Sequence, residues 1–263
     1  MNWKATVLVF LLAGPVLAHD IWVETNTNII RSGDAIHIDL KLGNHGNDHR
    51  DFKLASKLAA RDCKLEVAAP DGKQFDLRER LIDIGYAPQE GYWTTKFAAS
   101  QPGVYTVIHT YDRVVHYAPV RAIKSAKTMF VVSESLDNVA RDQSGFDTPF
   151  GHALEIVPVT NPVAPMGPGQ PIKIQVLYQG KPWTAGRVSF IPRGETLEEG
   201  FDAEYERTTD SRGLASFSPR TGNVYLVVAH HVEPQASGDG YESTKYSATL
   251  VVYVPEVCPC CNE

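Results

Sequence analysis

The sequence predicts an all-β fold made of two tandem β-sandwich domains, immunoglobulin-like or transthyretin-like, after a signal peptide. Apolar and polar residues alternate with a period of two in many short segments, and these segments are rich in β-branched and aromatic residues. No long stretch shows the 3.6-residue period of an amphipathic helix. Clusters of Gly, Pro, Asn and Asp separate the segments, as turns separate strands.

The first segment, residues 1–18, has the three regions of a signal peptide. Lys4 provides the positive charge, an apolar run follows at 5–12, and small residues end the segment at Ala18. The apolar run is much shorter than the roughly 20 residues that cross a bilayer as a helix. We therefore expect a periplasmic or secreted protein with no membrane span of its own, whose mature chain begins at His19.

An N-terminal sandwich is expected over residues 19–133. One segment in it, 52–60, lacks alternation and could hold a short helix or an irregular excursion. The predicted strands of this domain share the alternating pattern and lie at residues 35–42, 63–67, 103–111 and 126–132.

A polar segment rich in Asp, Asn, Ser and Gly follows at 134–153 and is the predicted linker. The second sandwich is expected over 154–255, with a cysteine-rich tail at 256–263. Within it, a tight turn is predicted where Asp210 accepts local amide bonds and Gly213 takes a positive φ. The strands predicted for this domain lie at 154–157, 172–178, 186–191, 214–217, 223–230 and 247–254.

The net charge of the chain disfavours some classes of binding partner. The formal net charge is −6 with histidines neutral, so nucleic acid and anionic membrane surfaces are disfavoured. The chain has nine histidines, which makes metal ligation a hypothesis to weigh against ordinary strand and loop positions. No phosphate-binding Gly-rich loop, nucleophile elbow or His-Glu-x-x-His helix occurs, so no catalytic residues and no enzyme activity are predicted.

Three motifs together carry a family resemblance. They are the start His19-Asp20-Ile21-Trp22, the block at 154–158 with Gly180-Lys181-Pro182 after it, and the turn at 209–213 followed by 246–250. The chain resembles the periplasmic family catalogued as domain of unknown function 4198, which is similar to NikM-like components of nickel and cobalt uptake systems. The resemblance implies an accessory role in metal uptake or sequestration, with membrane transport components as partners.

His19 would offer two nitrogens to a metal ion after cleavage, one from its α-amino group and one from its ring. One further histidine would complete a three-nitrogen site suited to copper or nickel. The alternative is that His19 is only the first residue of a frayed strand.

The pair His230-His231 ends a strand predicted at 223–230. Neighbouring strand residues point to opposite faces, so only one of the two rings can serve a given site. Either could partner His19, or both could be solvated at the strand end.

A histidine-containing loop is predicted at 44–49. His45, Asp48 and His49 could bind one ion if the loop folds back, or could form an ordinary polar surface. Further along, His109 and His116 could face one another across a hairpin, or simply fill strand positions.

Four cysteines complete the candidates. A disulfide between Cys63 and the tail is the expectation for an exported chain, although the sequence leaves its connectivity open. The tail thiols Cys258, Cys260 and Cys261 could also bind a soft metal ion.

The leading hypothesis is therefore a periplasmic protein that binds nickel, cobalt or copper. The alternative is an interaction module for a carbohydrate or protein partner, with Trp93 and Trp183 exposed as a platform instead of buried in the core. A third hypothesis is a copper-dependent oxidase built on an N-terminal histidine brace.

Overall fold

The computed structural model describes residues 19–43, 59–87, 90–115, 118–136, 139–140 and 143–256. These residues form 17 strands and two short 3-10 helices, η1 (Ala60–Asp62) and η2 (Arg78–Arg80). The predicted all-β fold is thus confirmed. Of the segment predicted as a short helix at 52–60, all but the last two residues lie outside the described part of the chain.

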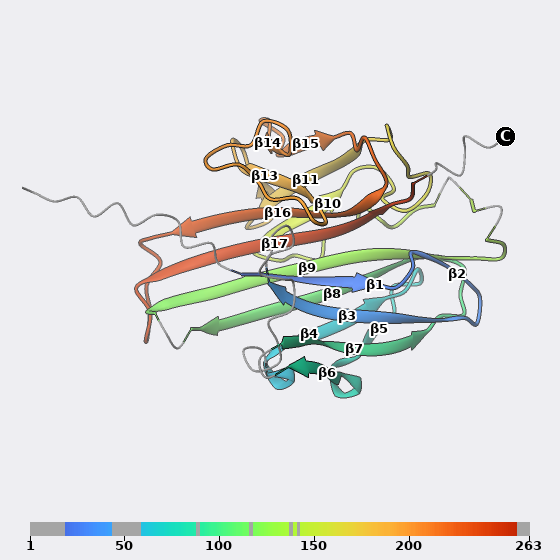
Figure 1. Cartoon of the computed structure of the whole chain (residues 1–263). Coiled ribbons are helices and arrows are strands. Elements are labelled where there is room, and N and C mark those ends of the chain that lie inside the picture. The colour runs from blue at the N-terminus through green and yellow to red at the C-terminus, as the bar shows by residue number, and fades with distance from the viewer. Residues whose placement is uncertain are drawn as a thin grey trace, which may run out of the picture.

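The central element is a sheet of nine strands (Figure 1). Its order is β14-β13-β16-β17-β9-β8-β4-β5, with β2 paired to β9. The bounds are β14 Glu206–Thr208, β13 Arg187–Pro192, β16 Asn223–Glu233, β17 Ser243–Val254, β9 Val120–Ser133, β8 Gly103–Val114, β4 Lys64–Ala68, β5 Gln74–Asp76 and β2 Ile29–Arg31.

Two smaller sheets accompany it. One has the antiparallel order β1-β3-β7-β6, and in the other β11 pairs with β10, β12 and β15. The bounds are β1 Asp20–Thr25, β3 Ala35–Gly43, β7 Glu90–Ala98, β6 Ile82–Ala87, β10 Leu154–Pro158, β11 Ile172–Tyr178, β12 Lys181–Pro182 and β15 Leu214–Phe217.

The nine-stranded sheet joins the two halves of the chain. β9 and β17 pair in parallel, from Val120 opposite Ser243 to Thr128 opposite Val251. Two hydrophobic cores accompany this sheet. One contains residues between Ile21 and Val132, and the other is built mainly between Leu154 and Val254. One sheet thus contains strands of both halves, and the division into two domains with a linker at 134–153 stays a prediction.

The predicted turn before β15 forms as expected. The Asp210 carboxylate accepts the backbone N–H groups of Arg212 and Leu214, each at 2.8 Å. Gly213 has φ 73°, and a Cβ there would lie 2.6 Å from the Val176 carbonyl oxygen. Glycine is therefore required at this position both by conformation and by space.

Alternation explains why these segments are strands. From Ala35 to Leu40 of β3 every second residue is buried, and Ile36, Ile38 and Leu40 belong to the first core. In β11 the buried residues Ile172, Ile174 and Val176 likewise enter the second core. Period-two burial is what a strand requires when one of its faces packs on a core.

No helix in the described part of the chain is long and apolar enough to cross a membrane.

Candidate functional site

The candidate site lies where β1 begins, next to the end of β16. His230, Ser247, Lys124 and Tyr111 are neighbours in one row across β16, β17, β9 and β8. Directly paired residues point to the same face of a sheet. The row therefore presents its side chains on one face, and the first residues of β1 contact two of its members.

His230 and Asp20 form the central contact of the site. The Nε2 atom of His230 lies 2.7 Å from Oδ1 of Asp20, although the two residues are 210 positions apart in the sequence. The Asp20 side chain is 14% exposed and the His230 side chain is 49% exposed. The aspartate is thus largely buried while the ring remains accessible to solvent.

Electrostatics favours the charged forms of this pair. Burial alone would raise the pKa of Asp20, but His230 and Lys124 together hold that pKa below its usual value. The Asp20 carboxylate raises the pKa of His230, against the opposing effect of burial. Each partner stabilises the charge of the other.

Two side chains of the central sheet hold the start of β1 in place. Lys124 Nζ donates to the backbone oxygen of His19 at 2.6 Å. Thr249 Oγ1 donates to the backbone oxygen of Ile21 at 2.8 Å. The backbone is therefore held at the residue before Asp20 and at the residue after it.

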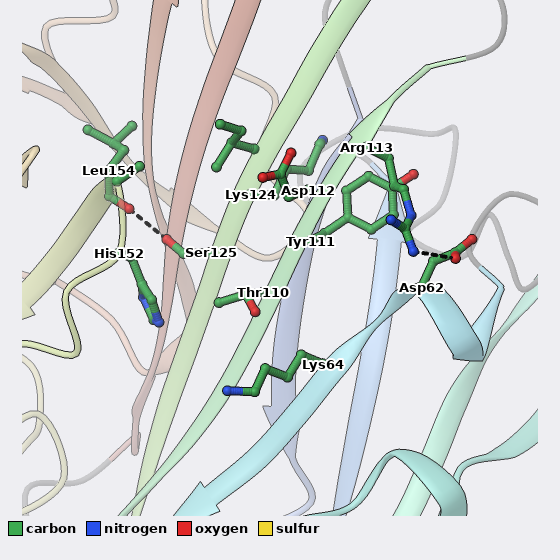
Figure 2. Close-up of a pocket in the computed structure, with 12 residues that line it drawn as sticks. Asp62, Lys64, Thr110, Tyr111, Asp112, Arg113, Lys124, Ser125, His152 and Leu154 are labelled. Atoms are coloured by element: carbon green, nitrogen blue, oxygen red, sulfur yellow. Dashed lines mark hydrogen bonds and ion pairs between the residues drawn. The ribbon is translucent and has the colours of Figure 1, made fainter.

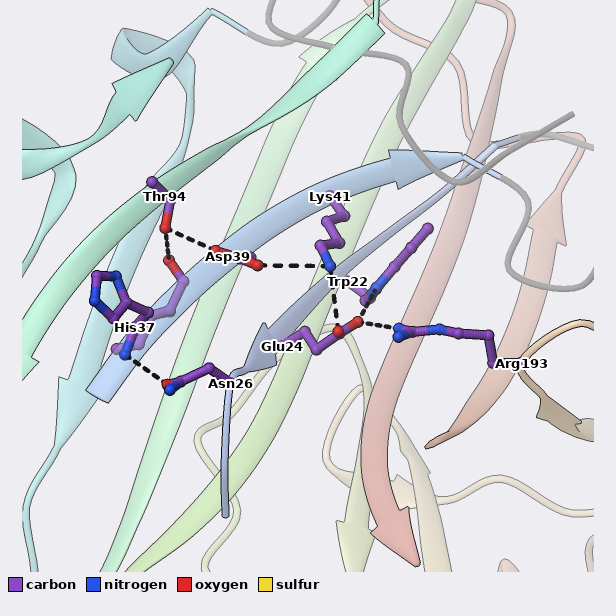
Figure 3. Close-up of polar contacts among 9 residues, drawn as sticks. Trp22, Glu24, Asn26, His37, Asp39, Lys41, Thr94 and Arg193 are labelled. Atoms are coloured by element: carbon purple, nitrogen blue, oxygen red, sulfur yellow. Dashed lines mark hydrogen bonds and ion pairs between the residues drawn. The ribbon is translucent and has the colours of Figure 1, made fainter. Parts of the chain in front are cut away.

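A second group of polar contacts holds the other end of β1 (Figure 3). Glu24 accepts bonds from Lys41 Nζ at 3.2 Å, from Trp22 Nε1 at 3.2 Å and from the Arg193 guanidinium. Burial would raise the pKa of Glu24, but Lys41 and Arg193 hold it below its usual value. Since Arg193 follows β13, this group connects β1 to the second half of the chain.

His231 points to the opposite face from His230, as alternation predicted. Its ring centroid lies 4.5 Å from that of Tyr178, 5.7 Å from that of Trp183 and 5.9 Å from that of Tyr246. Its Nε2 lies 3.9 Å from a carboxylate oxygen of Glu233. Aromatic rings at these separations pack directly against one another, so His231 belongs to a filled cluster.

Several predicted ligands lie outside the described residues. This applies to His45, Asp48 and His49 of the loop, to His116, and to the tail cysteines Cys258, Cys260 and Cys261. Their roles stay predictions.

Cys63 is buried, and burial raises the pKa of its thiol to about 12. Its predicted disulfide to the tail stays a prediction, because the tail cysteines lie outside the described residues.

Among the residues that the structure describes, no three His, Cys, Asp or Glu side chains lie close enough together to hold a metal ion. The predicted cleavage after Ala18 would add one more ligand at the start of β1, the α-amino group of His19.

Two contributors to this region, Asp20 and Lys124, were not predicted as site residues. Asp20 was visible only as part of the start motif, because its partner His230 is distant in the sequence. Lys124 occupies an ordinary alternating position in β9. No local signal marks either residue, since their roles arise from the packing of β1 on the central sheet.

A polar pocket of about 360 Å³ has Tyr111 and Lys124 of this row in its lining (Figure 2). Lys64, Thr110 and His152 line one end of it, and Arg113 pairs with Asp62 at 2.8 Å at the other. A second acidic residue of the lining, Asp112, is paired with Arg121. Both carboxylates are neutralised by their own arginines, so neither is left to attract a cation.

The two tryptophans proposed as an exposed platform are both partly buried. Trp93 packs against the first core and Trp183 against the second. Their rings contribute to the packing of the sheets.

The sequence and the structure were compared with those of known proteins. No curated protein matches it. Among solved structures it is similar to Escherichia coli alpha-2-macroglobulin activated by porcine elastase, with 14% identity and a TM-score of 0.27, over 90% of this chain and 20% of that one. It is also similar to a DUF4785 family protein from Legionella pneumophila, with 11% identity and a TM-score of 0.27, over 90% of this chain and 56% of that one.

A third similar structure is the Yersinia pseudotuberculosis adhesin InvE, with 12% identity and a TM-score of 0.23, over 88% of this chain and 58% of that one. The chain spans less than two thirds of the length of these three proteins. The family model described as "Domain of unknown function (DUF4198)" matches residues 16–233, which is most of the chain. The chain therefore belongs to the DUF4198 family.

Proposed function

We propose that the chain, after cleavage behind Ala18, binds one divalent transition metal ion through His19 and His230. Nickel, cobalt and copper are the candidate ions. The function would be metal uptake or sequestration outside the cytoplasm, and the resemblance to NikM-like proteins suggests membrane transport components as partners.

The ligand set consists of three nitrogens. His19 contributes its α-amino group and one ring nitrogen, which close a chelate ring within a single residue, and His230 contributes the third. Imidazole and amine nitrogens suit nickel and copper better than they suit magnesium or calcium. This set also agrees with the lack of a three-side-chain cluster in the described residues, because one of its three ligands is a backbone amine.

The observation that carries the proposal is the 2.7 Å contact between His230 and Asp20. It brings the end of β16 next to the residue that follows His19. His19 precedes β1, which begins at Asp20. The rule that neighbouring strand residues point to opposite faces therefore does not apply to His19, and its ring is able to turn toward His230. The bond from Lys124 to the His19 backbone oxygen further holds residue 19 at this place.

Isothermal titration with nickel, cobalt and copper tests the proposal. Protein that begins at His19 is compared with the same protein carrying one extra alanine before His19. The extra residue converts the α-amine into an amide, which is a poor ligand, and leaves every side chain unchanged. We expect one-to-one binding in the first protein and at least a tenfold loss of affinity in the second.

Two histidine variants complete the titration. His230→Ala should weaken binding by a similar factor. His37→Ala is the matched control, because His37 is an exposed histidine on β3 and lies outside the proposed site. Equal affinity of the cleaved and extended proteins would refute the proposed site, and so would unchanged affinity in His230→Ala.

A further inference from the structure

The contact between His230 and Asp20 also determines which nitrogen of the ring is free. A carboxylate can only accept hydrogen bonds, so the ring nitrogen that faces it must carry a proton. That nitrogen is Nε2, at 2.7 Å from Asp20 Oδ1. In a neutral imidazole the other nitrogen, Nδ1, then holds the lone pair that a metal ion needs.

The carboxylate is well fixed for this purpose. The residues on both sides of Asp20 are held by Lys124 and Thr249 through their backbone oxygens. Trp22, two residues further along β1 and on the same face as Asp20, is completely buried against Leu226, Val228 and Val251.

The same packing fixes β16. Leu226 and Val228 alternate with their neighbours so that they share a face with His230, and both contact the Trp22 cluster. Asp20 therefore contacts His230 at the same place where Trp22 packs on the two apolar residues.

We propose that Asp20 is a positioning residue that fixes His230 in its Nε2-protonated form and presents Nδ1 as the metal-binding atom. The ligand role of Nδ1 rests on the proposed function. The protonation pattern of the ring does not, because it follows from the contact with Asp20 alone. Histidine ligands that donate their second N–H to a carboxylate are a general arrangement at metal sites, where the carboxylate orients the ring and increases its basicity.

The ring pattern can be measured without metal. Long-range ¹H–¹⁵N correlation spectra of ¹⁵N-labelled protein distinguish a protonated from an unprotonated ring nitrogen. The spectrum is recorded on protein beginning at His19, at rising pH until the ring signals no longer change and the ring is neutral, and His230→Gln assigns the signals. We expect Nε2 protonated and Nδ1 unprotonated. A protonated Nδ1 would overturn the inference.

Asp20→Asn then tests the cause. Asparagine has nearly the same size but can donate as well as accept, so it no longer dictates the position of the ring proton. We expect a mixture of the two neutral forms in the spectrum and metal affinity lowered by about 10- to 100-fold. Asp83→Asn is the control for lost charge, because Asp83 is an exposed acid on β6, and it should change neither quantity.

The failures of the two proposals are distinguishable. Protein with the expected ring pattern and no metal affinity would overturn the proposed function and the ligand role of Nδ1. Metal affinity in the parent protein together with an unchanged ring pattern and affinity in Asp20→Asn would overturn the role of Asp20 and leave the proposed function standing.

Discussion

Lys127 of β9 and Glu155 of β10 form an ion pair that is almost entirely removed from water. Nζ lies 2.8 Å from Oε1, and the two side chains are 2% and 1% exposed. The same carboxylate accepts the backbone N–H groups of Phe150, Gly151 and His152 at 2.7, 3.0 and 3.1 Å. Glu155 thus connects the central sheet to the segment that precedes β10.

Removal of the lysine from this pair should be costly. Lys127→Met leaves the Glu155 carboxylate buried without its cation, and we expect the free energy of unfolding to fall by about 3–5 kcal/mol. Urea unfolding followed by tryptophan fluorescence measures it. The control is Arg31→Met, which breaks the exposed pair with Asp34 and should cost less than about 1 kcal/mol. Equal losses in the two variants would contradict the assigned role of burial.

Buried His109 should make the protein sensitive to acid. Burial lowers the pKa of His109 from its usual 6.5 to about 3. Its Nδ1 donates to the Lys64 backbone oxygen at 3.0 Å, and its Nε2 has no hydrogen-bond partner among the described residues. Below pH 6.5 the unfolded chain takes up a proton that the folded chain cannot accept. Stability is therefore lost as the pH falls from 6.5 toward 3.

The variant His109→Gln removes this proton uptake and keeps a donor for the Lys64 oxygen. Between pH 6.5 and 4.5 the parent protein should lose about 2 kcal/mol more than the variant, because the slope approaches about 1.4 kcal/mol per pH unit only below pH 6.5. Urea unfolding at a series of pH values measures the difference. His37→Gln, at an exposed position, should follow the parent curve. A variant at position 109 with the parent's pH dependence would disprove the prediction.

Strands were predictable because a strand with one buried face has an apolar residue at every second position, as in β3 and β11. The opposite directions of His230 and His231 followed from the same rule. The parallel pairing of β9 with β17 was not predictable, since it joins segments more than a hundred residues apart and neither carries a sign of its partner. The single sheet through both halves is a consequence of that pairing.

The candidate site was predictable only in part. His19 and His230 were predicted as metal ligands from their residue type and position, His19 at the predicted mature N-terminus and His230 at the end of a strand. Asp20 as the partner of His230, and Lys124 as the partner of the His19 backbone, depend on how β1 packs on the central sheet. Such contacts are long-range in sequence and leave no local pattern, whereas the turn at Asp210 and Gly213 is local and was predicted in detail.

That turn provides a matched pair of glycine variants. Gly213 and Gly180 have nearly equal φ values of 73° and 72°, but only at Gly213 would a Cβ meet another atom within 4 Å. Gly180→Ala should cost about 1–2 kcal/mol, the penalty for an L-residue in the left-handed region. Gly213→Ala should cost about 1–3 kcal/mol more, because its Cβ crowds the Val176 oxygen. Thermal unfolding compares them, and equal costs would show that the turn relaxes without penalty.

Metal removal should change the stability of the cleaved protein only. An ion that binds the folded chain at 100 times its dissociation constant stabilises that chain by about 2.7 kcal/mol. For a chain of this size, this corresponds to a rise in Tm of about 5–10 °C. Calorimetry of protein beginning at His19 should show the rise with the ion that binds in the titration, and a chelator should reverse it.

Protein with one alanine before His19 should have the same Tm without metal and no rise with it, because only the α-amine has been altered. An equal rise in both proteins would place the bound ion elsewhere in the chain. The histidine loop with His45 and His49, and the tail cysteines, would then be the next positions to substitute, since their predicted ligand roles do not involve the α-amine.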